Sequence, residues 1–95
     1  MLSRVDHGPG SDQRPHKAPD LELNEVVDGY VVYQPSRDRV HYLNRTALIV
    51  LELCTGENGT GEITAVVQEV FDLPDPPAAE IEACLAQLRL ESLVR

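Results

Sequence analysis

The stretch RVHYLNRTALIVLELCTG, residues 39–56, decides the fold of this chain. Its first five residues alternate in polarity and include the β-branched Val40 and the aromatic Tyr42, a pattern typical of a strand. Asn44 follows, and its side-chain oxygen can accept from the free amides of a helical first turn. The apolar residues after it predict a helix that is buried on more than one side and closes with Gly56 in the left-handed position. The predicted strand therefore leads directly into a helix, and its edge lies next to that helix.

Two further strands precede this stretch. Residues 21–26 alternate and predict the first strand, although the alternation slips at its end. Asp28-Gly29 predicts a hairpin turn because both residues tolerate positive φ. Residues 30–34 are rich in Tyr and Val and predict the second strand, and a turn beginning at Pro35 leads into the third. The result is an antiparallel meander whose first and third strands are its edges unless the connections reorder them.

Two helices follow the glycine-rich loop after residue 56. We expect Thr60 to cap the first, which runs over residues 62–71, because its apolar side chains are spaced by three and four residues. Asp75-Pro76 is typical of a cap and a first helical position, and it predicts a last helix over residues 76–91. The predicted fold is an α+β domain, a three-stranded antiparallel sheet followed by three helices.

Composition and charge narrow the function classes. The 95 residues suffice for one small domain, and with no Trp and one Phe its core must be aliphatic. No apolar run approaches the roughly 20 residues of a membrane span, and no apolar signal segment opens the chain, so a cytoplasmic protein is expected. The formal net charge is −8, and because basic and acidic residues balance over residues 1–20, the excess falls on residues 21–95. Such a surface repels phosphate backbones and argues against nucleic-acid binding.

The remaining chemistry is sparse. Residues 1–20 lack periodicity and predict a flexible tail ahead of one domain over residues 21–95. Cys54 and Cys84 fall among aliphatic residues of predicted helices, where Cys behaves as a small hydrophobe, and no His stands at zinc-ligand spacing. No nucleophile, base and orienting group can be assembled. The sequence therefore predicts neither an enzyme nor a metal or cofactor site.

Several short motifs resemble those of the PqqD-like family, also called the precursor-peptide recognition element of ribosomally synthesised and modified peptides (RiPPs). The resemblance covers residues 21–95. The matching segments are Asp28-Gly29, Leu43-Asn44-Arg45-Thr46-Ala47, Leu51-Glu52-Leu53-Cys54-Thr55-Gly56, Glu62-Ile63, and Ile81-Glu82-Ala83-Cys84-Leu85-Ala86-Gln87-Leu88 followed by Leu93-Val94. Two residues depart from the pattern: Ser92 stands where the family commonly has Gly, and Cys84 where it often has an aromatic residue.

The resemblance implies a winged helix-turn-helix-like fold and a non-catalytic adaptor. Such proteins bind the leader of a precursor peptide and present it to a modifying enzyme, often a radical-SAM protein. An extended leader can satisfy the unpaired N–H and C=O groups of the third strand and so add one strand to the sheet. The resemblance implies a groove between that strand and the third helix. The expected strand wall is Arg39, Val40, His41, Tyr42 and Leu43, and the expected helix wall is Ile81, Glu82, Leu85 and Arg89. Alternation leaves open whether Val40 and Tyr42, or Arg39, His41 and Leu43, face the groove.

Other functions stay open. A winged-helix DNA-binding protein shares the fold class, but residues 62–71 contain no Lys or Arg, which a recognition helix needs. A dimerisation module could pair the same strand edge with a second copy, so the chain is expected to be a monomer or a weak dimer. The acidic surplus forms a solvated surface that can steer a basic partner enzyme or a basic leader.

Overall fold

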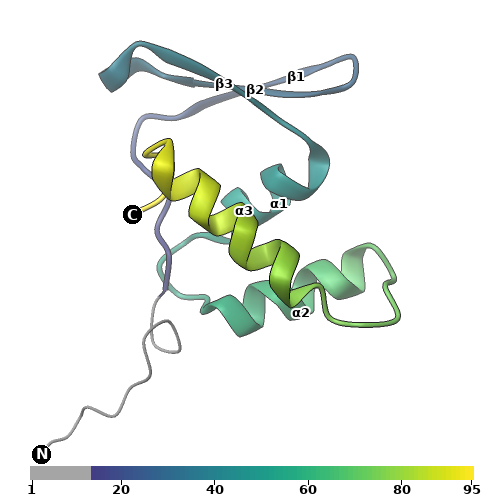
Figure 1. Ribbon diagram of the computed structural model, residues 1–95. Helices are drawn as coiled ribbons and strands as arrows, with labels where there is room; N and C mark the ends of the chain where they lie inside the picture. Colours follow the sequence, from purple (N-terminus) through teal and green to yellow (C-terminus); the bar gives the residue numbers. More distant parts are fainter. Residues whose placement is uncertain (1–13) are drawn as a thin grey trace, which may run out of the picture.

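The computed structural model describes residues 14–95 and shows a sheet followed by three helices, with the sheet lying on one side of them (Figure 1). The strands are β1 (Glu22–Val26), β2 (Gly29–Gln34) and β3 (Arg39–Leu43), paired antiparallel in the order β1-β2-β3. The helices are α1 (Arg45–Leu53), α2 (Thr60–Val70) and α3 (Ala78–Leu90), and a short 3-10 turn, η2 (Pro35–Arg37), joins β2 to β3. The predicted α+β order is confirmed, and β1 and β3 are the sheet edges. The winged helix-turn-helix-like label stays a prediction.

The first hairpin turns one residue earlier than predicted. Val26 pairs with Gly29, so the loop consists of Val27 and Asp28, and neither Asp28 nor Gly29 has a positive φ. Gly29 is needed for its small size instead, because a Cβ there would lie 3.0 Å from the carbonyl oxygen of Leu43. The close approach of β2 to the end of β3 therefore explains this glycine.

The start of α1 agrees with the sequence, whereas its end does not. Asn44 caps the helix through its side-chain oxygen, which accepts from the Ala47 N–H at 2.8 Å. The helix stops at Leu53, so Gly56 lies in the following loop and not directly after the last turn. Gly56 does have a left-handed φ of 89°, and a Cβ there would meet the His16 ring at 2.6 Å. Close packing and backbone conformation both require glycine at this position.

The other two helices begin two residues away from the predicted starts. Gly59, and not Thr60, is the N-cap of α2, and its N–H donates to the Glu62 carboxylate at 2.6 Å. Pro77 precedes α3, so Asp75 is not its cap. Pro76 and Pro77 disfavour the helical conformation of the residues before them, Asp75 and Pro76, which delays the first helical turn.

The core is aliphatic, as the composition predicted. Helix α1 packs against the sheet and against both other helices, while α2 and α3 pack on each other. The fully buried side chains include Val32 from the sheet, Val50 and Leu51 from α1, Ile63 and Val67 from α2, and Ile81, Leu85, Leu88 and Leu93 from α3 and its extension. This packing holds α3 at a fixed place beside the sheet.

Residues 15–18 pack against the domain and carry several backbone hydrogen bonds. The N–H groups of Lys17 and Ala18 donate to the carbonyls of Cys54 and Leu93, each at 2.8 Å, and Pro15 and Ala18 are buried. The tail predicted over residues 1–20 therefore overlaps the packed part of the chain, and its first thirteen residues lie outside the described structure. Within residues 14–95, no helix combines the length and apolar character needed to cross a membrane.

Candidate functional site

The outer edge of β3 offers unpaired backbone groups. Within the described residues, β3 pairs with β2 alone. The two-residue loop at Val27 and Asp28 makes Val26 and Gly29 a hydrogen-bonded pair, and hydrogen-bonded pairs then alternate across the sheet. By that alternation Arg39, His41 and Leu43 bond to β2. The N–H and C=O groups of Val40 and Tyr42 point away from the sheet.

The side chains of β3 divide between two faces. His41 and Leu43 are 8% and 7% exposed and face the helices, whereas Val40 and Tyr42 are 54% and 79% exposed on the opposite face. Arg39 lies at the exposed start of the strand, in register with Gln34. Of the two alternatives left open by the sequence, the set containing His41 and Leu43 is the one that faces α3.

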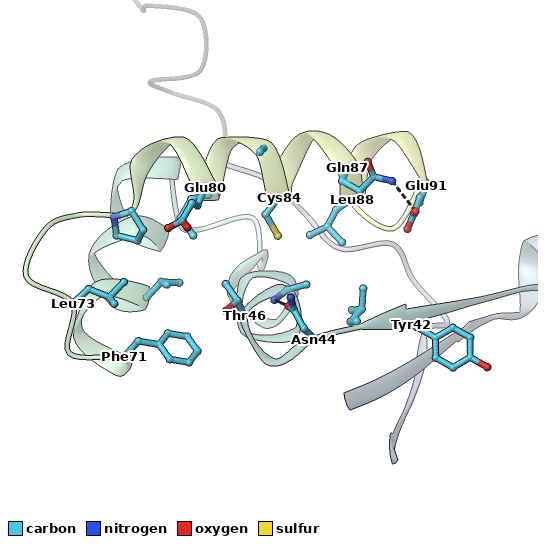
Figure 2. Close-up of a pocket in the computed structure, with 16 residues that line it drawn as sticks. Tyr42, Asn44, Thr46, Phe71, Leu73, Glu80, Cys84, Gln87, Leu88 and Glu91 are labelled. Atoms are coloured by element: carbon cyan, nitrogen blue, oxygen red, sulfur yellow. Dashed lines mark hydrogen bonds between the residues drawn. The ribbon is translucent and has the colours of Figure 1, made fainter. Parts of the chain in front are cut away.

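A groove of about 830 Å³ opens between the end of β3, α1 and α3 (Figure 2). Its lining is mainly apolar and comprises Tyr42, Leu43, Asn44, Thr46, Ala47, Val67, Phe71, Leu73, Pro77, Glu80, Ile81, Ala83, Cys84, Gln87, Leu88 and Glu91. The Tyr42 side chain points away from α3, so that residue borders the groove with its backbone (Figure 2). The volume lies at the upper end of the range of ligand pockets.

One face of α3 forms the helix wall. Glu80, Cys84, Gln87 and Glu91 are spaced by four, three and four residues, which places them on the same side of a helix. Figure 2 shows the Cys84 sulfur pointing from α3 toward the residues of α1. This face lies next to the buried stripe that contains Ile81 and Leu88. The groove therefore lies along one side of the hydrophobic core.

The predicted wall residues are only partly brought together. Tyr42, Leu43 and Ile81 line the groove, while Arg39, Val40 and His41 do not. Leu85 is buried in the core, and Glu82 is exposed outside the groove. Arg89 borders a different hollow, beside Gln34 and Ser92. Contact of any of these residues with a peptide stays a prediction.

A buried polar network ties β3 to the end of α3. His41 Nδ1 lies 3.2 Å from Glu91 Oε1, and His41 Nε2 lies 3.2 Å from Gln34 Oε1. Gln34 donates through Nε2 to the Ser92 carbonyl at 2.9 Å, which turns its oxygen toward His41. Both neighbours present acceptor oxygens to the ring, so the ring donates to both only when it carries two hydrogens. The network fixes the distance between the two walls at this end of the groove.

Ser92 holds the network through an unusual backbone conformation. Its φ is 61°, in the left-handed region that residues with a Cβ rarely adopt. Glycine adopts this conformation without the steric cost that a Cβ brings. Hydrophobic periodicity could not reveal the network, because its members come from β2, β3 and the segment after α3.

The two thiols differ in their exposure. Burial and, to a smaller extent, the neighbouring Cys84 raise the pKa of the Cys54 thiol to about 11, and Cys54 donates to the Val50 carbonyl at 3.1 Å. Burial also raises the pKa of Cys84, which is half-buried in the groove wall. Both remain protonated thiols near neutral pH, where a thiol is a weak nucleophile. Within residues 14–95, no three His, Cys, Asp or Glu side chains gather closely enough to hold a metal ion.

The geometry defines a class of protein: a small α+β domain that exposes a strand edge beside an apolar groove. The family model of coenzyme PQQ synthesis protein D (PqqD) matches residues 29–94, more than half of the chain. The chain therefore belongs to the PqqD family, whose members are accessory proteins of PQQ and RiPP biosynthesis. No curated protein and no solved structure matches it.

Proposed function

We propose that this protein is a non-catalytic adaptor that binds the leader of a ribosomally made precursor peptide and presents it to a modifying enzyme. The observation that carries the proposal is the open edge of β3, which borders an apolar groove in a chain of the PqqD family. An extended peptide satisfies the free groups of such an edge and gains affinity from its main chain.

Binding proceeds through two kinds of contact. The peptide backbone pairs with the N–H and C=O groups of Val40 and Tyr42 and becomes a fourth strand. Its alternate side chains then enter the groove and cover the apolar residues on α1, α2 and α3. Main-chain pairing demands little of the peptide sequence, so selectivity depends on the groove.

The rigid packing around the edge supports this mode of binding. The polar network of His41 fixes β3 relative to α3, and α1 is held from both sides by the core. A preformed groove lowers the entropy that binding would otherwise cost. The bound leader keeps the rest of the precursor free for the modifying enzyme, for which a radical-SAM protein is our candidate.

The test is a titration with leader peptides encoded beside this gene. We expect saturable binding and shifts of amide signals along residues 39–43 and on the groove face of α3. Failure of every neighbouring precursor to bind would contradict the adaptor function. Sedimentation at several protein concentrations serves as the control, because pairing of β3 with a second copy would give a concentration-dependent dimer.

A further inference from the structure

The charged residues of the groove bear on the kind of peptide that it accepts. Among residues 14–95, Glu80 and Glu91 are the charged side chains in the lining, which contains no Lys or Arg from that part of the chain. Arg45 lies nearby, but its guanidinium carbon sits 5.5 Å from the centre of the Phe71 ring, outside the lining. The groove is therefore apolar along its floor and acidic at two points on the α3 wall.

The two carboxylates stand near opposite ends of α3 (Figure 2). Glu80 is exposed in the first turn, and Glu91 follows the last turn with a side chain that is 34% exposed. Eleven residues of helix separate them, which corresponds to about 16 Å along the axis. An extended chain covers that distance with about five residues, and a spacing of six residues is the next one that keeps both side chains on the same face of a strand.

Glu91 keeps capacity for a further donor. One oxygen contacts His41, and the other accepts from Gln87 Nε2 at 2.8 Å. Two carboxylate oxygens offer about four acceptor positions, so two contacts do not saturate the group. The C-terminal end of a helix also carries partial negative charge, which adds to that of Glu91 and favours a cation there.

We propose that the groove selects a basic leader segment: two Lys or Arg side chains about six residues apart, and so on one face of the strand, with apolar side chains between them. This inference rests on the proposed function. The cationic groups meet Glu80 and Glu91, and the apolar side chains cover the lining residues Phe71, Cys84 and Leu88. The formal charge of −8 on the whole chain adds long-range attraction for such a segment.

The test uses two synthetic peptides with equal apolar content. One carries the motif Lys-Thr-Leu-Thr-Leu-Thr-Lys and the other Glu-Thr-Leu-Thr-Leu-Thr-Glu, each between Gly-Ser flanks and labelled for anisotropy. We expect the lysine peptide to bind about five- to tenfold more tightly at low salt, with a smaller ratio at high salt. Each peptide's ability to slow the reaction of Cys84 with N-ethylmaleimide reports occupancy of the groove, and the buried Cys54 is the internal reference.

A matched pair of variants locates the effect. Glu80→Lys should remove the preference for the lysine peptide, whereas Glu82→Lys should keep it, because Glu82 lies on the same helix outside the groove. Equal binding of both peptides with equal protection of Cys84 would overturn the charge selection and leave strand addition intact. Equal effects of the two variants would also overturn it, since the net charge alone would then explain the preference. Binding of neither peptide would contradict the charge selection and strand addition together.

Discussion

The sheet has two edges, and they differ in what lies beside them. Within residues 14–95, β1 and β3 each pair on one side with β2, and each leaves alternate backbone groups unpaired on the other. No residue of β1 lines the groove, and Glu22, Asn24 and Glu25 on that strand are exposed. β3 instead runs into α1, and its end borders an apolar groove walled by α3. Backbone groups alone therefore do not define the site; an adjoining apolar surface does.

The difference has a physical cause in the chain. Charged and polar side chains on an edge strand discourage pairing with other chains, and β1 carries such residues. Within the described residues β3 pairs only with β2, and Gln34 and His41 contact Ser92 and Glu91, the residues that follow α3. The side chains of β1 thus discourage pairing with another chain, whereas the edge of β3 stays open to an added strand.

A proline substitution on each edge strand should give the largest difference between β3 and β1. Val40→Pro removes an outward N–H and places a ring where the peptide backbone would lie, while the β2 ladder keeps its bonds because proline is tolerated on an edge. We expect peptide affinity to fall about hundredfold, or about 2.7 kcal/mol, measured by anisotropy. Glu25→Pro is the matched control, because the same alternation gives Glu25 an outward amide on β1. Equal losses in both variants would remove the distinction between the edges.

Substitution of His41 should have the next largest effect, a loss of folding stability. His41→Ala leaves the buried Gln34 oxygen without its partner, and Glu91, which is 34% exposed and still accepts from Gln87, loses one contact. We expect the free energy of unfolding to fall by about 2 kcal/mol in urea titration, because unpaired buried polar groups are costly. Tyr42→Ala, whose side chain is exposed on the other face, should change stability far less. A stable His41→Ala protein with unchanged peptide affinity would show that the network does not hold the groove.

Gly29 tests the approach of β2 to the end of β3. An added methyl group would lie 3.0 Å from the Leu43 carbonyl oxygen, so Gly29→Ala should lower stability by about 1 kcal/mol. Gly61→Ala in α2 is the control, because a Cβ there meets nothing within 4 Å and alanine favours helix. We expect opposite signs in thermal unfolding. Stabilisation by both substitutions would refute the close contact.

The smallest expected effect is at Ser92. Ser92→Gly relieves the left-handed φ of 61°, partly offset by the greater freedom of glycine in the unfolded chain. A gain of about 0.5 kcal/mol in unfolding free energy follows, with peptide affinity unchanged. A loss of stability would indicate that the serine side chain contributes more than its backbone costs.

Local sequence signals predicted much of the fold but less of the site. The alternation of residues 39–43 and the cap at Asn44 gave β3 and the start of α1 correctly. Residues 15–18 escaped notice because their order comes from hydrogen bonds to Cys54 and Leu93, which are distant in sequence. Short extended segments of this kind carry no periodicity that a sequence pattern can reveal.

Of the expected helix wall, Ile81 lines the groove, whereas Glu82, Leu85 and Arg89 lie outside its lining. Apolar spacing identifies the residues that face the core, and so it selected Leu85, which is fully packed there. The groove lies on the adjacent face, where Glu80, Cys84, Gln87 and Glu91 follow the same helical spacing with mixed polarity. Which flank of α3 turns toward β3 depends on how α3 packs on α1 and α2, and that is a tertiary property.

Hydrogen exchange of the β3 amides tests strand addition most directly. In the free protein the Val40 and Tyr42 amides should exchange quickly and the His41 amide slowly, because only His41 bonds to β2. A saturating leader peptide should slow exchange at Val40 and Tyr42, leave His41 nearly unchanged, and leave Leu23 and Glu25 on β1 unaffected. Saturable binding without added protection at Val40 and Tyr42 would contradict strand addition at this edge.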